Sequence, residues 1–390
     1  MIMSFVRNPI GNGSKLLPSL SQLFSTSVAP LPARSRGVKA KRTSENDPTK
    51  HTQDHVGLYY TVPDPVKKQL FSMGGLPKPF AANTRTFSEC SFMVRSPAVE
   101  LIQRFNAADF SKPALKFVLY GRPGCGKSLT VAHLLHYALV NNFVIVHVPW
   151  TWNWFRRSFT EVTYSRKDKK IVDLPILSAQ WLKHFQIQNA GIDSLNLQTS
   201  KDYNWSQREQ TPAGSPLSAL VTHGINRVKF AAEVIKALLD ELKISCNSDK
   251  CKVVVAVDGF NALVGDYDTQ LKTEDKIKVR TGMVTLSHVF QDATKSDWKN
   301  GAVIVTVDQL ASPYGSLESH WPIYLLGRKG FEHLDPFIPI SVTEYSDLEL
   351  NSALDYYEDR MWLQRTEGRH ELGFLSNKNP YSLMTLCSGL

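Results

Sequence analysis

Residues 121–128 have the residue types and spacing that most clearly specify chemistry. They read Gly-Arg-Pro-Gly-Cys-Gly-Lys-Ser and match the pattern G-x-x-x-x-G-K-[ST]. Glycines there let the backbone curl until successive N–H groups point at phosphate oxygens, beside the positive end of the following helix. Lys127 would reach the β and γ phosphates, and the Ser128 hydroxyl would bind Mg²⁺. We therefore predict a nucleotide site made by Gly121, Arg122, Pro123, Gly124, Cys125, Gly126, Lys127, Ser128 and Leu129.

A carboxylate that would complete the magnesium site follows the apolar run 253–257. The run is Val-Val-Val-Ala-Val, and Asp258 comes directly after it. Because Mg²⁺ prefers oxygen ligands, we predict Ser128 and Asp258 as the metal ligands. The alternative is a turn-forming role for Asp258 before Gly259.

The residues after Asp258 bear on whether the chain is an enzyme. Many hydrolases place a glutamate beside the metal-site aspartate to orient the attacking water, whereas this chain continues Gly259, Phe260, Asn261. Asn261 could polarise water weakly, but an amide does not accept a proton as a carboxylate does. We assign no catalytic residue and expect a retained nucleotide whose hydrolysis is slow or absent.

The base of the nucleotide is left open by the sequence. The Asn-Lys-x-Asp signature of many GTPases is incomplete, because Asn377-Lys378-Asn379 is not followed by an aspartate. The residues alone leave GTP, GDP and ATP open as the nucleotide, each bound with Mg²⁺. Asp308 and Asn379 are candidates for a γ-phosphate sensor and a lid contact, or for a strand-end cap and a turn.

A parallel sheet is the element expected to position these side chains. Strand-sized apolar runs at 115–120, 143–148, 253–257, 303–307 and 337–342 alternate with helical patterns at 97–106, 128–139, 224–243 and 283–293. This alternation is typical of an α/β layer fold with flanking helices. No run approaches the roughly 18 apolar residues of a membrane span.

Four regions are predicted along the chain. Residues 1–44 are a mitochondrial transit peptide with an uncertain cleavage point. Residues 45–97, rich in Pro, Gly and polar residues, are an extended N-terminal arm. Residues 98–345 are the nucleotide-binding domain, with an insertion at 151–219, and residues 346–390 are a small C-terminal helical lid.

The net charge of the chain is concentrated at its start. Of 45 Lys and Arg against 36 Asp and Glu, seven basic residues precede the first acid, Glu45. A basic, serine-rich, acid-free segment is typical of a transit peptide, and the alternative is the disordered basic tail of a cytosolic or nuclear RNA-binding protein. Without this segment, 38 basic residues face 36 acidic ones. Five scattered cysteines indicate a reducing compartment.

The insertion contains aromatic and basic residues in close succession. Trp152, Trp154, Phe155 and Phe159 are interleaved with Arg156, Arg157, Arg166, Lys167, Lys169 and Lys170. One interpretation is an RNA-facing surface, in which basic groups contact phosphates and rings stack on bases. The other, which we favour, is that the rings pack on their own domain beneath a solvated basic rim.

With these residues in view, the chain resembles the death-associated protein family of the mitochondrial small ribosomal subunit. The resemblance runs from about residue 55 to the C-terminus. It is carried by Thr86-Phe87-Ser88-Glu89, Met93-Val94-Arg95, the segment 121–128, Trp205, Arg208-Glu209, Gly214-Ser215-Pro216-Leu217, Val255-Ala256-Val257-Asp258-Gly259, Asn261-Ala262-Leu263, Leu334-Asp335-Pro336-Phe337-Ile338-Pro339-Ile340, Leu375-Ser376-Asn377 and Asn379-Pro380. Pro123 and Cys125 depart from the family at variable loop positions, and Pro123 removes one backbone donor.

The resemblance implies an AAA+-like P-loop domain that binds GTP in the head of the mitochondrial small ribosomal subunit. It implies a location in the mitochondrial matrix, contacts with small-subunit proteins and some rRNA, and a bridge to the large subunit. It also implies a pro-apoptotic role. We expect no homo-oligomer.

Two functions remain open at this point. The first is a structural ribosomal protein that holds a guanine nucleotide and supports mitochondrial translation. The second is a free-standing AAA+ or STAND-type NTPase in signalling or remodelling. That NTPase would need a catalytic carboxylate beside Asp258 and an arginine finger.

Overall fold

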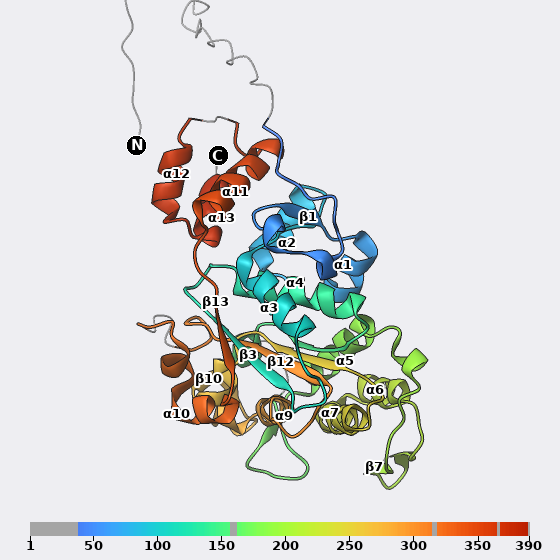
Figure 1. Ribbon diagram of the computed structural model, residues 1–390. Helices are drawn as coiled ribbons and strands as arrows, with labels where there is room; N and C mark the ends of the chain where they lie inside the picture. The colour runs from blue at the N-terminus through green and yellow to red at the C-terminus, as the bar shows by residue number, and fades with distance from the viewer. Residues whose placement is uncertain (1–37, 157–161, 314–317, 365–366, 389–390) are drawn as a thin grey trace, which may run out of the picture. The chain divides into compact units, whose positions relative to one another are not determined.

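A parallel five-stranded sheet forms the centre of the described chain (Figure 1). The computed structural model describes residues 38–156, 162–313, 318–364 and 367–388. The strands are β3 (Leu115–Tyr120), β4 (Val144–Val148), β9 (Val253–Val257), β12 (Gly301–Thr306) and β13 (Ile338–Ser341). They lie in the order β13–β3–β12–β9–β4. The predicted α/β fold with a parallel sheet and flanking helices is therefore confirmed.

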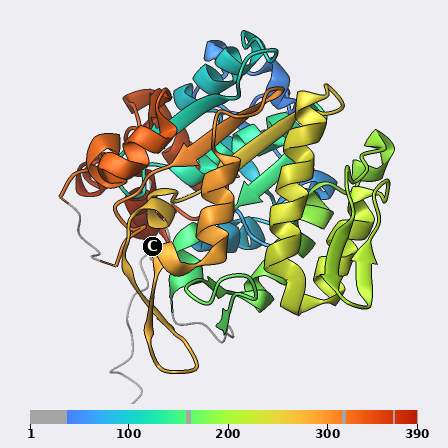
Figure 2. The same ribbon diagram turned by 90° about the horizontal axis from the view of Figure 1, so that it is seen from below.

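The two faces of the sheet are buried in two separate cores, because successive side chains of a strand point to opposite faces. In β3, Val118 joins one core while Phe117 and Leu119 join the other. The Phe117 core includes α3 (Ser96–Asn106) and α4 (Lys127–Val140). The Val118 core includes α5 (Pro175–Gln188), α6 (Leu217–Asn226), α7 (Ala231–Asn247), α8 (Asn261–Val264), α9 (Thr285–Ala293) and α10 (Pro322–Leu334). Figure 2 views the sheet from the side that α7 and α9 cover.

The strand register brings three carboxyl ends to one edge of the sheet. Leu119 of β3 pairs with Thr306 of β12, and Val257 of β9 pairs with Val305 of β12. Gly121 follows β3, Asp258 follows β9 and Asp308 follows β12. The predicted site residues therefore emerge together at this edge.

The interpretation of residues 45–97 as an extended arm is wrong. They contain β1 (Tyr59–Thr61) paired antiparallel with β2 (Ser91–Met93), and helices α1 (Asp64–Phe71) and α2 (Lys78–Thr86). Tyr60, Leu70 and Phe92 are buried in the same core as α3 and α4. The prolines that suggested an arm stand in the first turns of α1 and α2, where a missing N–H costs no hydrogen bond.

The predicted helix at 224–243 is divided in the structure. Helix α6 ends at Asn226, a short 3₁₀ turn occupies Val228–Phe230, and α7 begins at Ala231. Gly224 lies in the last turn of α6, and a Cβ built on it would lie 2.5 Å from Leu182 Cδ1. The apolar period continues across this bend because both helices pack on α5 and on the same core.

The aromatic side chains of the insertion belong mainly to the core. Trp152 and Trp154 are each 6% exposed and Phe155 is fully buried, so these rings are not available to stack on bases. Both Arg166 and Lys167 form ion pairs with Glu233. The packing interpretation is thus supported for these residues, whereas Arg157 and Phe159 lie outside the described residues.

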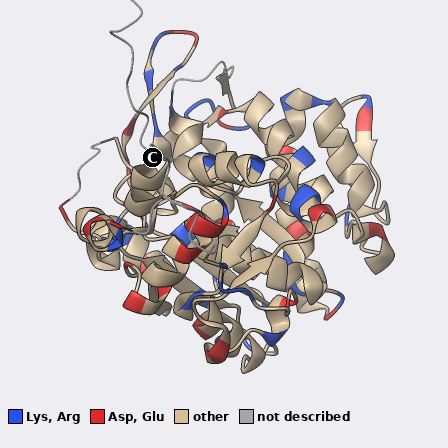
Figure 3. Ribbon diagram, turned by 90° about the horizontal axis from the view of Figure 1, so that it is seen from above, with Lys and Arg blue, Asp and Glu red and all other residues tan. Residues whose placement is uncertain are grey.

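Three hairpins complete the region between β4 and β12. Their strands are β5 (Thr163–Tyr164) with β6 (Val172–Asp173), β7 (Tyr203–Ser206) with β8 (Glu209–Thr211), and β10 (Asp268–Lys272) with β11 (Lys278–Arg280). Basic and acidic residues lie interspersed over the described elements in Figure 3. None of the helices in the described ranges could cross a bilayer.

The C-terminal region consists of α11 (Asp347–Asp359), α12 (Arg369–Ser376) and α13 (Pro380–Cys387). These helices share a third core with residues of the antiparallel pair β1–β2. Within it, the rings of Tyr59 and Tyr356 stack with centroids 4.2 Å apart. The predicted transit peptide falls largely on residues 1–37, which lie outside the described residues.

Candidate nucleotide site

The loop 121–128 connects the end of β3 to the start of α4, as the sequence pattern requires. Gly124 has φ +83°, a left-handed conformation that favours glycine, and a Cβ there would lie 2.6 Å from Asn379 Oδ1. A Cβ on Gly121 would lie 2.0 Å from the carbonyl oxygen of Val342. Both glycines are therefore required by close approach of other parts of the chain. Gly126, also left-handed, caps the start of α4.

The ammonium of Lys127 lies inside the loop. Its Nζ donates to the carbonyl oxygens of Gly121 at 2.7 Å and Arg122 at 3.0 Å. It also pairs with Asp308 Oδ2 at 2.8 Å. The Lys127 residue is only 4% exposed. The predicted phosphate-binding lysine is thus fixed among carbonyl and carboxylate oxygens, where a phosphate oxygen would be a chemically equivalent partner.

The two predicted metal ligands lie in contact. Ser128 Oγ donates to Asp258 Oδ2 at 2.6 Å, and Thr306 Oγ1 donates to Asp258 Oδ1. Burial raises the pKa of Asp258, while the two hydroxyl donors act in the opposite direction. A serine hydroxyl beside a carboxylate at the first turn of a helix is a donor set that fits Mg²⁺. Thr306 is a site residue that sequence reasoning missed.

Asn261 holds a strand end in place, and the expectation that it could polarise water is not supported by its contacts. Its Nδ2 donates to the carbonyl oxygens of Asp308 at 3.0 Å and Ala311 at 3.2 Å. Its Oδ1 accepts the backbone N–H of Asp308 at 3.0 Å. Asn261 is fully buried. Its amide is therefore used to position the segment that carries Asp308.

The backbone conformation and close neighbours at the position after Asp258 favour glycine. Gly259 has φ +80°, and a Cβ on it would lie 3.0 Å from Thr151 Oγ1 and 3.2 Å from Ala311 Cβ. Its N–H donates to Thr306 Oγ1 at 2.8 Å. A glutamate beside the metal-site carboxylate would be strained here.

Arg95 connects the loop to the C-terminal region. Sequence reasoning missed this role of Arg95. Its Nη1 donates to the carbonyl oxygen of Cys125 at 2.5 Å, and its Nε pairs with Glu349 Oε1 at 3.0 Å. Its Nη2 donates to the carbonyl oxygens of Thr343 and Glu344. Arg95 and Glu349 are 254 positions apart, so no local pattern could indicate the pair.

Two residues near the C-terminus contact the loop backbone. Asn379 Nδ2 donates to the carbonyl oxygen of Pro123 at 2.9 Å. The backbone N–H of Tyr381 donates to the carbonyl oxygen of Gly124 at 3.1 Å. Asn379 Oδ1 also accepts the N–H groups of Tyr381 and Ser382, and so caps α13. Asn379 therefore contacts the loop and caps a helix, whereas the lid contact expected of it stays a prediction.

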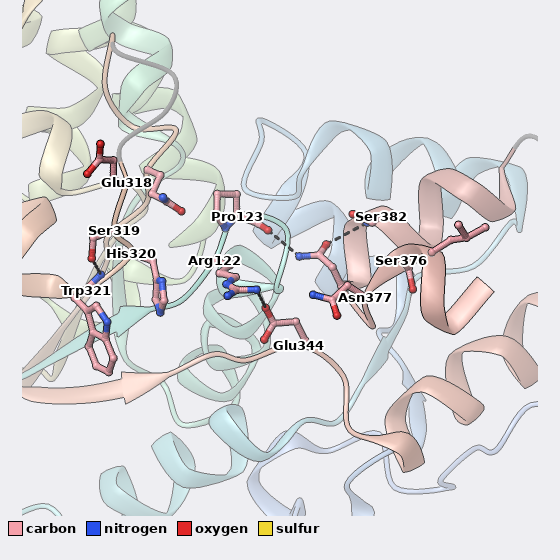
Figure 4. A pocket seen from close by; sticks show the side chains of 13 residues that line it. Arg122, Pro123, Glu318, Ser319, His320, Trp321, Glu344, Ser376, Asn377 and Ser382 are labelled. Atoms are coloured by element: carbon pink, nitrogen blue, oxygen red, sulfur yellow. Dashed lines mark hydrogen bonds and ion pairs between the residues drawn. The ribbon is translucent and has the colours of Figure 1, made fainter. Parts of the chain in front are cut away.

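A cavity of about 710 Å³ adjoins the loop at Arg122 and Pro123 (Figure 4). Its other walls come from the segment 318–321, from Glu344 and from the C-terminal helices. Arg122 Nη1 lies 3.5 Å from Glu344 Oε1. The lining includes Gln309, directly after Asp308.

The cysteines form no metal site with other ligand residues in the described ranges. Cys246 and Cys251 lie with their sulfurs 3.7 Å apart. Cys125 is fully buried in the loop, and burial raises the pKa of its thiol to about 11. Its thiol is therefore neutral near pH 7.

Comparisons with known proteins match most of the chain. A family model described as mitochondrial ribosomal death-associated protein 3 matches residues 92–386. The small ribosomal subunit protein mS29 of Bos taurus is 38% identical over 364 residues, covering 92% of this chain and 89% of the relative. The mS29 protein of Mus musculus is 36% identical over 371 residues, covering 94% and 93%. That of Neurospora crassa is 24% identical over 273 residues, covering 67% and 54%.

Proposed function

The chain belongs to the mitochondrial ribosomal death-associated protein 3 family, and from that premise we propose that it is a small-subunit protein of the mitochondrial ribosome that holds a guanine nucleotide as a structural element. The observation that carries the ribosomal assignment is similarity to two mammalian relatives over at least 92% of this chain. Both relatives are small ribosomal subunit proteins. The chain is accordingly associated with the mitochondrial ribosome.

The nucleotide part of the proposal is supported by the geometry of residues 121–128. Gly124 and Gly126 turn the backbone as a phosphate-binding loop requires, and Lys127 points into that loop. Ser128 and Asp258 would hold Mg²⁺. Bound Mg²⁺ would supply positive charge to the phosphate oxygens. The backbone from Gly121 to Leu129 would surround the phosphates.

The fold proposal is an AAA+-like P-loop domain. Counted in chain order, the sheet strands lie fifth, first, fourth, third, second, with the loop after the first and Asp258 after the third. This order places β12 between the loop strand and the Asp258 strand. It supports the arrangement that the family resemblance implies.

Slow or absent hydrolysis is the third part of the proposal. The position after Asp258 is a left-handed glycine, and both polar atoms of the Asn261 amide are engaged with backbone. Neither residue can act as a general base for an attacking water. The alternative is a free-standing AAA+ or STAND-type NTPase. It would need a carboxylate beside Asp258, and Gly259 stands there instead, which disfavours this alternative.

The proposed partners are small-subunit proteins, some rRNA and a bridge to the large subunit. Outside the segment before Glu45, basic and acidic residues number 38 and 36, which favours protein-rich surroundings over deep burial in rRNA. The proposed transit peptide, residues 1–44, would direct the chain to the matrix. N-terminal sequencing of the mature protein would locate its cleavage point.

Two measurements test this function. Mitochondrial lysate is sedimented through a sucrose gradient, and the chain is expected in the small-subunit peak; its absence there would contradict the ribosomal assignment. Nucleotide is then released from the purified particle and from the purified chain and identified by mass spectrometry. GDP or GTP is expected in amounts stoichiometric with the chain, and an adenine nucleotide would contradict the guanine proposal.

A further inference from the structure

Two of the five cysteines lie side by side next to the start of β9. The sulfurs of Cys246 and Cys251 are 3.7 Å apart, within the range of a thiol hydrogen bond. Cys246 lies in the last turn of α7, and Cys251 lies two residues before β9 begins at Val253. Asp258 follows the other end of this strand, so the pair is separate from the candidate nucleotide site.

Asn300 holds together the two backbone segments that carry these cysteines. Its Nδ2 donates to the carbonyl oxygen of Cys246 at 3.0 Å. Its own carbonyl oxygen accepts the N–H of Val253 at 3.1 Å. The backbone is thereby fixed in a position that already brings the two sulfurs together. Closing the gap to the S–S distance of about 2 Å in a disulfide is therefore a matter of side-chain movement.

The two thiols differ in exposure and in proton affinity. Cys246 is fully buried, whereas Cys251 is 8% exposed. With Cys246 as the donor, its S–H lowers the pKa of Cys251 because it stabilises the thiolate, while burial acts in the opposite direction. The same hydrogen bond, together with burial, raises the pKa of Cys246. Because the thiolate is the nucleophile, Cys251 is the attacking thiol of the pair.

The other three cysteines lack this arrangement. Burial raises the pKa of Cys90, Cys125 and Cys387 to about 11 in each case. In the part of the chain that the structure describes, none of the three has a hydrogen bond to another sulfur. They are therefore an internal reference for the reactivity of a buried cysteine without a partner thiol.

We propose that Cys246 and Cys251 form a redox modification site, which hydrogen peroxide converts to an intramolecular disulfide. The Cys251 thiolate attacks one peroxide oxygen, so that an S–O bond forms, the O–O bond breaks, and the departing hydroxide takes up the proton that the Cys251 thiol released. The Cys246 sulfur then attacks the Cys251 sulfenic acid. The S–S bond forms, the S–O bond breaks, and the Cys246 proton leaves with that oxygen as a second water. Two thiols are thus oxidised and one peroxide is reduced to two waters.

Mass spectrometry of the purified full chain tests the proposal. Trypsin cleaves after lysine, so the two cysteines fall in separate peptides, 244–250 and 251–252, which stay joined only through a disulfide. The reduced chain is treated with hydrogen peroxide, the remaining thiols are blocked with N-ethylmaleimide in urea, and the digest is analysed. We expect the joined peptides, and loss of these two thiols at least about tenfold faster than loss of the other three. Dithiothreitol should restore both thiols.

Two serine variants separate the roles of the pair. In Cys246→Ser the serine hydroxyl can still donate to Cys251, but no second sulfur is present, so dimedone should trap a sulfenic acid at Cys251. Cys251→Ser removes the attacking thiol and should leave Cys246 reduced. Cys387→Ser, at a buried cysteine without a partner thiol, is the matched control and should leave the yield of joined peptides unchanged.

The wild-type chain alone can contradict the proposal, whether or not the variants fold. Absence of the joined peptides, or equal rates of loss for all five thiols, would overturn it. A sulfenic acid trapped at Cys246 in Cys251→Ser would overturn the assignment of Cys251 as the attacking thiol. The proposed ribosomal and nucleotide-binding function stands or falls separately, because none of these measurements involves a nucleotide or the particle.

Discussion

The side-chain amide of Asn379 donates a hydrogen bond of 2.9 Å to the carbonyl oxygen of Pro123, and thereby connects the C-terminal helices to the loop 121–128. The contact is close enough that the neighbouring loop position tolerates no side chain, since Asn379 Oδ1 lies 2.6 Å from where a Cβ of Gly124 would be. The loop and the C-terminal region are therefore fitted to each other, and substitutions in either should affect both.

Gly124→Ala should weaken both the fold and nucleotide binding. Left-handed backbone costs a non-glycine residue about 1–2 kcal/mol, and here the added methyl group also meets Asn379 and Tyr381. We expect the free energy of unfolding, measured by urea denaturation, to fall by more than about 2 kcal/mol. Gly214→Ala is the matched control, because Gly214 has φ +81° but no atom within 4 Å of its Cβ position. Equal losses in the two variants would contradict the contact argument.

Glu349→Gln should destabilise the chain by about 3 kcal/mol, because it leaves the buried guanidinium of Arg95 without a charged partner. The measurement is again urea denaturation. Glu100→Gln breaks a pair with Arg104 whose side chains are both 43% exposed, and should change stability by less than about 0.5 kcal/mol. If the two variants were equally stable, the Arg95 pair would not be holding the C-terminal region to the loop.

Lys127→Ala should abolish nucleotide binding and lower incorporation of the chain into the small subunit, as measured by gradient sedimentation and quantitative mass spectrometry. The substitution also leaves Asp308 buried without its partner. The double variant Lys127→Ala with Asp308→Ala removes that charge and isolates the loss of nucleotide. Normal incorporation of a variant that holds no nucleotide would show that the nucleotide is not structural.

The purified chain should release phosphate from GTP more slowly than about 1 s⁻¹. The reason is that neither Gly259 nor Asn261 offers a base to an attacking water. Phosphate release is followed with excess GTP and Mg²⁺, and Lys127→Ala provides the background rate. Sustained wild-type turnover at or above that value, absent from Lys127→Ala, would contradict the prediction.

Acid should destabilise the chain through its buried histidines. Burial lowers the pKa of His136 from 6.5 to about 4. Since the folded-state value is the lower one, the unfolded chain binds more protons between pH 6.5 and about pH 4, and stability falls as pH drops through this window. His136 should account for about 2 kcal/mol of the loss between pH 7 and pH 5.

The variant His136→Phe keeps a ring against Tyr60, whose centroid lies 5.9 Å away, and should flatten the pH dependence of the unfolding free energy by that amount. His370→Phe, at an exposed position, should leave the pH profile unchanged. A wild-type profile that stays level from pH 7 to pH 5 would refute the assignment to His136.

The sheet and the loop could be predicted because both depend on short-range patterns. Each strand of the central sheet is four to six residues long and mostly apolar, and the expected bounds 115–120 and 253–257 agree with β3 and β9. The proximity of Ser128 and Asp258 followed from the same reasoning, since Asp258 comes directly after a strand that lies beside β12. Their role as metal ligands stays a prediction. For β3, β9 and Asp258, the local sequence pattern and the observed strand pairing therefore indicate the same structure.

Residues 45–97 were misinterpreted because proline occurs both in loops and at helix N-termini. It disrupts the interior of a helix but is well accommodated in the first turn, and Pro65 and Pro79 occupy first turns. Helices α1 and α2 are only eight and nine residues long, so their hydrophobic periodicity is weak compared with the loop signal of the neighbouring Pro and Gly residues. Burial against α3 and α4 stabilises them.

The supports of the loop could not be predicted from sequence order. Arg95 and Asn379 contact the loop, and Thr306 contacts Asp258, from positions scattered along the chain. Single polar residues carry no periodicity. The role of Asn261 was misjudged for a related reason, because the amide that could polarise water is bound to the backbone around Asp308. Only the fold reveals which polar atoms are already engaged.

The contact between Asn379 and Pro123 also sets an order of events during biogenesis. The loop is synthesised early, yet the residue that binds its carbonyl group follows 256 positions later. A chain whose synthesis has not yet reached α13, or one shortened before α13, would contain every residue of the loop without this support. If the proposed nucleotide binding needs this contact, it would reach full strength only once α13 has been made and folded, and a chain shortened before α13 would bind the nucleotide more weakly.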